Sequence, residues 1–365
     1  MSPEYKSPLQ QMALTTPTDF WNDSGALAEL NYALDNGAVG ATTNPVIVLQ
    51  VLKQEMSLWK DRLEQIIRDH PTWSEVEVAW QISQDIALRG AELLLPVFER
   101  EHGCKGRISL QTNPAFYRDS AAIVAQGRHF AGLAPNIQVK IPVTAAGIEA
   151  AEQLTYEGIV TTATVSFTVP QVIAVAEAVE RGLRLRAAEG KPVENIVPAA
   201  VLMVGRLDDW LQALIKRDGI PVDPGVIYWA GIAVFKRAHE IFHERGYRSR
   251  LLGAAVRSVL HWTELIGADA AITIPYEWQL LINRSGLPVK NRIDEPVDPR
   301  ILGDLQRCFP DFRRAYEPDG MRAGEFETFG STARTLRGFL GAYADLLSTV
   351  RDAMLPNPDT LKPAA

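Results

Sequence analysis

The sequence predicts an α/β protein folded as a (β/α)8 TIM barrel, with extra helices after the second strand and a C-terminal helix. Eight short β-like segments alternate with longer amphipathic segments over roughly 260 residues, the pattern and length of such a barrel. A doubly wound open sheet is the competing architecture, but the chain carries no Gly-rich dinucleotide-binding fingerprint that would support it. The barrel is therefore the preferred prediction.

The expected strands are rich in Val, Ile, Ala and Thr and are flanked by turn-forming residues. They lie at residues 18–23, 38–43, 106–112, 136–142, 158–167, 195–204, 249–256 and 268–275. Between them, apolar residues at helical spacing predict helices such as Gly147–Tyr156 and Ala176–Glu189.

Two regions exceed the repeating unit. Residues 46–105 are too long for one βα unit and predict an insertion of two or three helices. The region near 290–365 predicts a Pro- and Asp-rich connection followed by a helix near Ser331–Met354. We expect residues 1–365 to form a single barrel domain that includes both extensions.

The composition is that of an ordinary globular protein, with 47% hydrophobic and 22% charged residues. The 37 basic and 44 acidic residues give a net charge of −7, so nothing indicates a nucleic-acid partner. Cys104 and Cys308 lie far apart and outside any CxxC motif, which favours a reducing compartment and no metal framework. The N-terminal segment lacks the apolar core of a signal peptide, and no apolar run is long enough to cross a membrane. These features predict a cytoplasmic protein without a membrane partner, and they are compatible with a homo-oligomer.

One lysine interrupts a strand that should be buried. In NIQVKIP at 136–142, alternation puts Ile137, Val139 and Ile141 on one face, with Gln138 and Lys140 on the other. Burying an ammonium group without a partner is costly. The simplest explanations are an edge strand whose lysine reaches solvent, or a lysine paired with a carboxylate.

The strands on either side of this lysine also have a polar face. Alternating polar positions on the third and fifth strands are Arg107, Ser109 and Gln111, and Thr162, Thr164 and Ser166. In a barrel, inward-facing residues at the C-terminal ends of the strands form the active site, at the end called here the barrel mouth. The polar faces can therefore converge with Lys140 at this mouth, which favours a chemical role for the lysine.

A buried lysine on such a face can serve as a nucleophile. A free lysine has a pKa of about 10.4, so only about one in a few thousand is unprotonated at pH 7. Burial in an apolar barrel can lower that pKa by several units. The neutral amine then attacks a carbonyl carbon to form a Schiff base, whose iminium draws electrons from the neighbouring C–C bond. That bond can break and re-form without a metal or an organic cofactor.

Several segments together resemble the transaldolase family of class I, Schiff-base aldolases, which includes the fructose-6-phosphate aldolases. These segments are ATTNPVIV at 41–48, VKIPVTAAGIEAAEQLTYEGI at 139–159, TATVSF at 162–167, VGRLDDW at 204–210, DPGV at 223–226 and LGAAVR at 252–257. They follow the family's order over about residues 18–280, and VKIP-x-T-x-x-G is the most specific of them. The resemblance implies transfer or cleavage of a dihydroxyacetone unit of a phosphorylated ketose, such as fructose 6-phosphate or sedoheptulose 7-phosphate, without metal or cofactor.

The resemblance also implies roles for individual residues. Lys140 occupies the Schiff-base position, and Asn44 matches the asparagine that contacts the bound substrate. Thr164 matches the threonine that helps to orient the catalytic water. Thr162 and Ser166, on the same strand face, are expected to contact the substrate.

At the expected phosphate-binding end of the site, some residues match the family pattern and others differ from it. Arg206 and Arg257 match the two arginines that hold the sugar phosphate, a role that suits the planar guanidinium group. Val201 and Ala255 replace serines that are common around the substrate, and Met203 replaces an aromatic residue. These changes leave the phosphate site and the natural substrate open.

The acid–base residues depart from the family pattern as well. The family's proton-transferring Asp ends the first strand in a D-[ST] sequence, whereas this chain reads WNDSGAL. Ungapped counting back from TTNP selects Asn22 and the local D-S pattern selects Asp23, while alternation cannot choose because Phe20 and Trp21 both suit a core. We expect Asp23 to be the acid, since an amide cannot transfer a proton as a carboxylate can, with Asn22 as a substrate contact. Gln111 stands where transaldolases proper usually carry Glu and the fructose-6-phosphate aldolases carry Gln, so the proton relay resembles that of the aldolases.

Other motifs support weaker alternatives. HEIFH at 239–243 has the spacing of a zinc hydrolase site but lacks an evident third ligand, and it falls on an expected outer helix. Asp208 and Asp209 are expected to favour the start of a helix, and His261 and Trp262 are expected on a helix that covers the barrel. A barrel that binds a sugar phosphate without turnover is a further alternative, suggested by the altered WNDSG segment.

Overall fold

The structure, a computed structural model, describes residues 5–356 and 358–359. Over these residues, parallel strands close into a barrel in sequence order. The strands are β1 Asp19–Asn22, β2 Gly40–Thr42, β3 Arg107–Gln111, β4 Ile137–Pro142, β5 Thr161–Thr164, β6 Ala199–Leu202, β7 Arg250–Gly253 and β8 Ala270–Ile274. The predicted (β/α)8 TIM barrel and its eight expected strands are therefore confirmed. Residues 1–4, 357 and 360–365 of the expected 1–365 domain lie outside the described residues, and the single-domain assignment stays a prediction.

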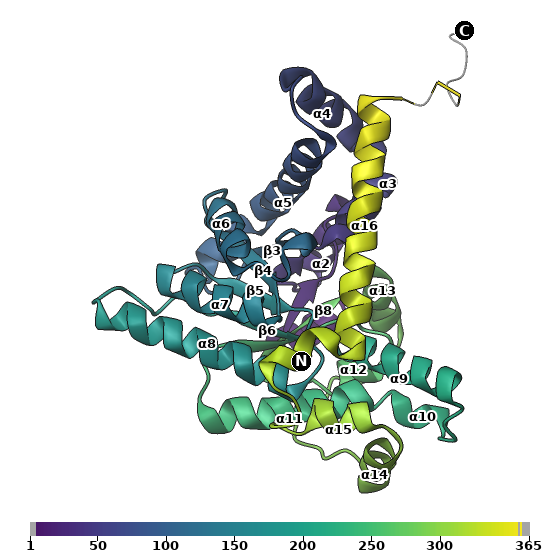
Figure 1. The fold of residues 1–365 in the computed structure, drawn as a ribbon. Helices are drawn as coiled ribbons and strands as arrows, with labels where there is room; N and C mark the ends of the chain where they lie inside the picture. Colours follow the sequence, from purple (N-terminus) through teal and green to yellow (C-terminus); the bar gives the residue numbers. More distant parts are fainter. Residues whose placement is uncertain (1–4, 357, 360–365) are drawn as a thin grey trace.

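Helices surround the barrel (Figure 1). They are α1 Pro8–Thr15, α2 Leu27–Asp35, α3 Pro45–Gln54, α4 Met56–Asp69, α5 Glu75–Arg100, α6 Ser120–Ala131, α7 Ala145–Glu157, α8 Val169–Ala188, α9 Val204–Asp218, α10 Pro224–Ile227, α11 Ala230–Arg245, α12 Leu260–Thr263, α13 Tyr276–Arg284, α14 Pro299–Cys308, α15 Pro310–Tyr316 and α16 Gly330–Met354, with 3-10 helices η1 Pro114–Phe116 and η2 Ala323–Thr328. The insertion after β2 consists of α3, α4 and α5, as predicted. The expected Pro- and Asp-rich connection also holds α14 and α15, two helices that the sequence pattern did not predict. Within the described part of the chain, no helix is long and apolar enough to cross a membrane.

Side-chain caps begin the helices that follow three of the strands. Asn44 accepts hydrogen bonds from the N–H groups at the start of α3, and Thr144 and Thr168 do the same for α7 and α8. Such caps satisfy N–H groups that have no partner within the helix. Each cap therefore fixes the turn that leaves a strand at the barrel mouth.

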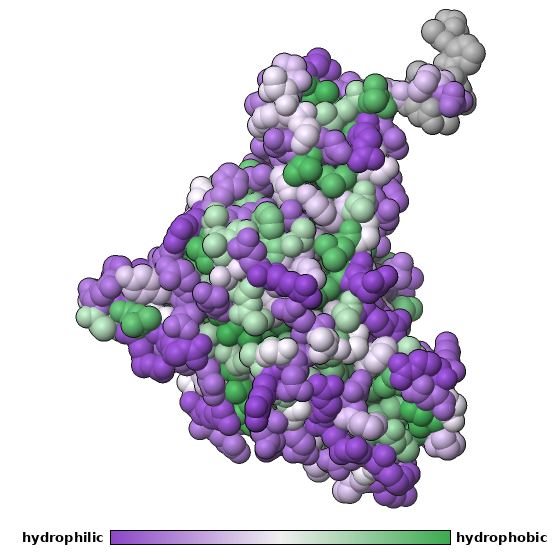
Figure 2. All heavy atoms as spheres, in the orientation of Figure 1, coloured by the Kyte–Doolittle hydropathy of each residue, from purple (hydrophilic) through white to green (hydrophobic). Residues whose placement is uncertain are grey.

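Helix α16 returns from the outer layer to the barrel. In Figure 1 it runs in yellow alongside α3 and past α9, and its buried face includes Phe339, Leu346 and Val350. Leu346 and Val350 pack into the apolar cluster formed by α3, α4 and α5. At the start of the helix, the Thr332 hydroxyl accepts a hydrogen bond from Gln171 Nε2 on α8. Figure 2 shows the same face, where small apolar patches border the path of α16 among mostly hydrophilic residues.

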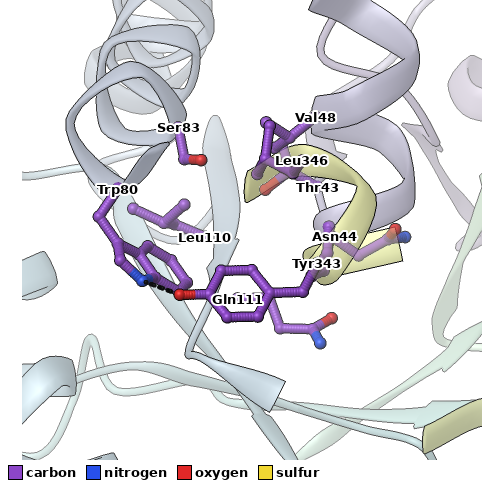
Figure 3. Close-up of a pocket in the computed structure, with 10 residues that line it drawn as sticks. Thr43, Asn44, Val48, Trp80, Ser83, Leu110, Gln111, Tyr343 and Leu346 are labelled. Carbon is purple, nitrogen blue, oxygen red and sulfur yellow. Dashed lines mark hydrogen bonds between the residues drawn. The ribbon is translucent and has the colours of Figure 1, made fainter. Parts of the chain in front are cut away.

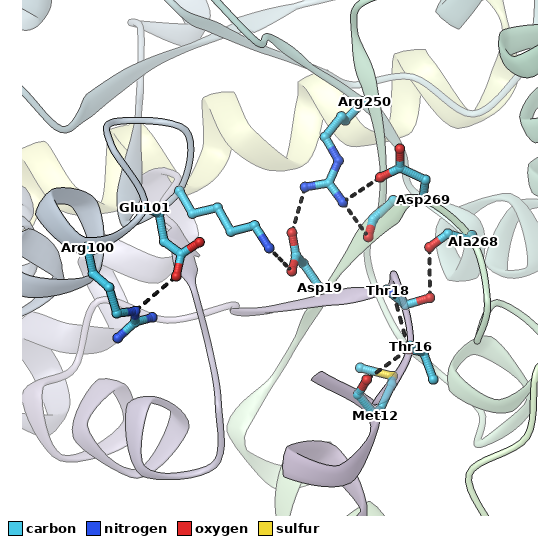
Figure 4. A network of polar contacts seen from close by, with 11 residues as sticks. Met12, Thr16, Thr18, Asp19, Arg100, Glu101, Arg250, Ala268 and Asp269 are labelled. Atoms are coloured by element: carbon cyan, nitrogen blue, oxygen red, sulfur yellow. Dashed lines mark hydrogen bonds and ion pairs between the residues drawn. The ribbon is translucent and has the colours of Figure 1, made fainter. Parts of the chain in front are cut away.

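An ion-pair network closes the end of the barrel opposite the mouth (Figure 4). Asp19, at the start of β1, is 5% exposed. Its carboxylate accepts hydrogen bonds from Lys105 Nζ at 2.8 Å and from Arg250 Nη1 of β7 at 2.6 Å. Arg250 also forms an ion pair with Asp269 at 3.0 Å. The network thus joins β1 to β7 and to the segment before β3.

We expect Asp19→Asn to lower the free energy of unfolding by roughly 2–3 kcal/mol, because it leaves two partly buried cations without their carboxylate. This loss is smaller than for a fully buried ion pair, since water still reaches both cations. Asp269→Asn is the matched control, because the Asp269 side chain is 80% exposed and the loss should stay below about 1 kcal/mol. Urea denaturation of the two variants measures both values. Equal losses would contradict the role given to Asp19.

Candidate active site

Lys140 lies inside the closed barrel and is 5% exposed. Its Nζ donates a hydrogen bond to the carbonyl oxygen of Thr43, just beyond β2, at 3.1 Å. A closed barrel has no edge strand, and among the described residues no carboxylate forms an ion pair with this ammonium group. Neither simple explanation for a lysine in this strand therefore applies.

The surroundings of Lys140 favour its neutral form. Burial lowers its pKa from 10.5 to about 8, with the positive charge of Arg206 adding to the decrease and the negative charge of Asp23 opposing it. With this pKa, about one Lys140 in ten is a neutral amine at pH 7. The electrostatic influence of Asp23 and Arg206 also indicates that both residues share the barrel mouth with the lysine.

Asp23 directly follows β1 and continues its pairing, because its N–H donates to the carbonyl of Ile274 in β8. The Thr42 hydroxyl donates to Asp23 Oδ1 at 2.6 Å and lies 3.1 Å from the hydroxyl of Thr273. Since Thr42 uses its only proton for Asp23, Thr273 must donate to Thr42. Thr42, which itself accepts a hydrogen bond from Thr273, thus holds the Asp23 carboxylate at the barrel mouth.

Asn22 takes a different direction. It is fully buried, its Oδ1 accepts a hydrogen bond from Gln279 Nε2 of α13 at 2.7 Å, and its Nδ2 donates to the carbonyl of Ser24. Both ends of the amide are therefore engaged between β1 and the outer helix layer. The structure does not bring Asn22 together with Lys140.

The polar faces of β3 and β5 meet inside the barrel. The hydroxyls of Ser109 and Thr162 are 2.8 Å apart, although their strands are separated by β4. In the register, Gln111 and Thr162 stand beside Lys140 on either side. Gln111 is 4% exposed, and its Oε1 has no hydrogen-bond partner among the described residues. Gln111 therefore retains an unused acceptor next to the lysine.

The end of β5 is strained. Thr164 is buried with its hydroxyl 4.0 Å from the sulfur of Met203, and Val165 follows it at φ 59°. A β-branched residue rarely adopts this left-handed conformation, which costs about 1–3 kcal/mol. Gln171 Nε2 donates to the Val165 carbonyl at 3.2 Å, and the Ser166 hydroxyl donates to the carbonyl of Val201. These bonds hold the turn and use the proton of the Ser166 hydroxyl within the protein.

A small cavity lies beside Gln111 at the end of β3 (Figure 3). Its volume is about 10 Å³, and its walls include Thr43, Asn44, Gln111, Trp80 of α5 and Tyr343 of α16. Asn44 uses its Oδ1 to cap α3, so Nδ2 is the group it can offer a ligand. The Tyr343 hydroxyl accepts a hydrogen bond from Trp80 Nε1 at 3.1 Å. A space of this size is close to that of one water molecule.

Three arginines, Arg206, Arg257 and Arg334, lie near Asp209 on the other side of the mouth. Arg257 Nε lies 3.5 Å from Asp209 Oδ2, and Arg334 of α16 donates to the Asp209 carbonyl at 3.2 Å. Arg206 lies over the ring of Phe339 at 5.5 Å, and its buried Nε has no partner among the described residues. Burial, together with the charges of Arg257 and Arg334, lowers the pKa of Arg206. The excess of positive charge suits an anionic ligand.

Sequence reasoning missed the contributions of α16, namely Arg334, Phe339 and Tyr343. The apolar spacing in this helix predicts one buried face, but that signal does not say what the face covers. Arg334 lies in no recognisable sequence motif, so the sequence does not distinguish it from other surface arginines. Trp80, from the insertion after β2, also forms part of the cavity wall.

The other motifs noted in the sequence form no contact with Lys140. His239 and His243 of HEIFH lie on α11 and border a surface hollow beside Arg250, at the start of β7. No group of three or more metal-binding side chains occurs in the described ranges, so the zinc alternative gains no third ligand. The helix-start role expected for Asp208 and Asp209 is wrong, because the first turn of α9 contains no acidic residue. Asp208 is instead buried against His261.

Comparisons with known proteins agree with this geometry. A family model described as transaldolase/fructose-6-phosphate aldolase matches residues 20–300. A transaldolase from Thiobacillus denitrificans is 30% identical over 297 residues, which cover 75% of this chain and 81% of the relative. A transaldolase from Thermobifida fusca is 32% identical over 313 residues, covering 83% and 80%. A protein named transaldolase 2 from Nostoc is 31% identical over 279 residues, covering 68% and 72%.

Proposed function

Because the chain belongs to the transaldolase/fructose-6-phosphate aldolase family, we propose that it transfers or cleaves the dihydroxyacetone unit of a phosphorylated ketose through a Schiff base on Lys140. Fructose 6-phosphate and sedoheptulose 7-phosphate are the proposed kinds of donor. The observation that carries the proposal is a lysine that is buried, that forms no ion pair with a carboxylate of the described residues, and whose pKa is lowered to about 8.

The first step needs a neutral amine and an electrophilic carbon. Lys140 Nζ attacks the ketose carbonyl, water leaves, and the resulting iminium carries the positive charge. Gln111 and Thr164 are proposed to orient the water, because both are buried at the strand ends that flank Lys140. A glutamine can only hydrogen-bond to that water, whereas a glutamate could also exchange a proton with it.

The second step breaks a C–C bond and requires a base. As the bond electrons move toward the iminium, the hydroxyl on the departing carbon loses its proton. We assign this proton to Asp23, whose carboxylate is held by Thr42 and influences the charge of Lys140. The departing aldehyde leaves an enamine on Lys140. An acceptor aldehyde regenerates the bond in a transaldolase, while protonation of the enamine and hydrolysis complete an aldolase reaction.

The phosphate end is proposed to lie at the arginines. Arg206 and Arg257 would bind the phosphate oxygens, and Arg334 adds a third positive charge from α16. Asn44 Nδ2 and Thr162 are proposed contacts for the sugar hydroxyls. Ser166 and Asn22, proposed from the sequence as substrate contacts, already use their polar groups within the protein.

Borohydride trapping tests the Schiff base. Incubation with fructose 6-phosphate and reduction should add one substrate fragment to the intact mass, and Lys140→Met should abolish the adduct without loss of stability, since a buried unpaired charge is removed. Initial trapping rates should rise about fivefold from pH 7 to 8 and level off above about pH 9, as the neutral fraction of a group with a pKa of about 8 does.

Two results would overturn this assignment. An adduct that persists in Lys140→Met places the chemistry on another lysine. Binding of the ketose without any adduct supports the sugar-phosphate-binding alternative instead. Release of aldehyde from fructose 6-phosphate in the absence of an acceptor distinguishes an aldolase from a transaldolase.

Asp23→Asn should lower the turnover number by about a hundredfold to ten-thousandfold, the usual contribution of general acid–base catalysis. The trapped Schiff base should then accumulate, because its cleavage slows more than its formation. Asn22→Ala is the neighbouring control and should act mainly through stability, since its amide bonds lie between β1 and α13. Full activity of Asp23→Asn together with loss of turnover in a folded Asn22→Ala protein would reverse the assignment.

Arg206→Gln and Arg257→Gln should each raise the Michaelis constant for fructose 6-phosphate about tenfold to a hundredfold, the weight of one charge-assisted contact. The constant for unphosphorylated fructose should change far less. Arg334→Gln should show the same selectivity with a smaller effect, roughly threefold to tenfold, because Arg334 is proposed to add a third charge and not a direct phosphate contact. Arg351→Gln, on the same helix but paired with Glu75, is the control. Equal effects on both sugars would exclude a phosphate contact.

A further inference from the structure

A chain of buried hydrogen bonds runs behind the arginines. Asp208 Oδ2 lies 2.8 Å from His261 Nε2, and His261 Nδ1 accepts the main-chain N–H of Arg257 at 3.1 Å. The other carboxylate oxygen of Asp208 accepts the N–H of Gly231 at 2.9 Å. His261 is 0% exposed and Asp208 4%. The chain therefore joins α9, α12 and α11 in the interior.

The direction of these bonds fixes the state of the imidazole. Because Nδ1 accepts an N–H, the proton of the neutral ring must be on Nε2, where it is donated to Asp208. The opposite tautomer would point a second N–H at the N–H of Arg257 and break that link. Asp208 favours the required tautomer by supplying the acceptor for Nε2–H.

The segment that carries Arg257 needs such a restraint. Ala255 has φ 61°, a conformation that non-glycine residues seldom adopt. Gly205 lets this segment approach α9 closely, because a Cβ at position 205 would lie 2.0 Å from the Ala255 carbonyl oxygen and 2.5 Å from Arg257 Cγ. Gly205 thus lies against the Ala255 carbonyl and the Arg257 side chain, while His261 holds the Arg257 main chain.

We propose that His261, kept in its Nε2–H tautomer by Asp208, is a positioning residue that holds the main chain of Arg257 and so sets the place of its guanidinium group at the mouth. The expected effect of His261 on phosphate binding rests on the proposed function. His261 itself touches no ligand, since it is buried beneath the segment that it holds.

Two substitutions separate positioning from simple packing. In asparagine the terminal amide is attached to Cγ, as Nδ1 is in histidine, whereas in glutamine it lies one atom further out, near the place of Nε2. His261→Asn can therefore still accept the Arg257 N–H through its oxygen, whereas His261→Gln keeps a polar group toward Asp208 and loses that acceptor. A role in packing alone would favour the larger glutamine.

The experiment uses the full chain with inorganic phosphate as the probe. Amide exchange of Arg257, followed by NMR, should accelerate about tenfold or more in His261→Gln and stay near the wild-type rate in His261→Asn. The dissociation constant for phosphate should rise about threefold to tenfold in His261→Gln only. Histidine ¹⁵N shifts of the wild-type protein should report the Nε2–H tautomer of His261.

Each outcome has a definite meaning. The Nδ1–H tautomer, or equal exchange rates in the two variants, overturns the inference. Arg257→Gln serves as the reference for phosphate binding. If this variant binds phosphate like the wild type, the proposed clamp fails while the exchange rates still decide the role of His261. If Arg257→Gln loses phosphate but His261→Gln does not, the positioning role is wrong and the clamp stands.

Discussion

The candidate site depends on one constraint, the burial of the Lys140 ammonium group away from ion pairing with any carboxylate in the described part of the chain. A salt bridge at Nζ would stabilise the charged form and remove the nucleophile, whereas a completely apolar site would make the unliganded protein costly to fold. The barrel avoids both extremes. The carbonyl of Thr43 accepts a hydrogen bond from Nζ, and Asp23 acts through space while Thr42 occupies one of its oxygens. The strand order places these groups, because β2, β3 and β5 present their inward residues around β4.

Much of this arrangement could be predicted because strand alternation is a strong local rule. It identified the inward positions of β3, β4 and β5, and the contact between Ser109 and Thr162 shows that these faces do meet. Alternation could not settle β1, where apolar residues on both faces make the two registers equally suitable. In the structure, Asn22 accepts a hydrogen bond from Gln279 on α13, more than 250 residues away in the sequence, and so points toward the outer helices. A hydrogen bond at that separation leaves no trace in the local pattern.

The same limit explains the other corrections. Asp208 has a charge and a position that suit an exposed helix start, and only the approach of α12 gives it His261 as a buried partner. Helix α16 has a clear apolar face, yet the pattern is identical for a helix lying on the outside of the barrel and for one bordering its mouth. The family match ends at residue 300, before this helix begins. Arg334 and Tyr343 could therefore be found only from the packed structure.

The position of α16 also has a consequence for the order in which the protein is built. Synthesis proceeds from the N-terminus, so every strand of the barrel leaves the ribosome before α16 does. The ring itself closes only when β8 pairs with β1. The mouth is complete only when α16 packs against α3 and α5, which brings Tyr343 to one side and Arg334 to the other. The strands that enclose the reactive lysine are therefore synthesised before the helix that completes its surroundings, so a chain that ends before α16 has all the strands but an incomplete mouth.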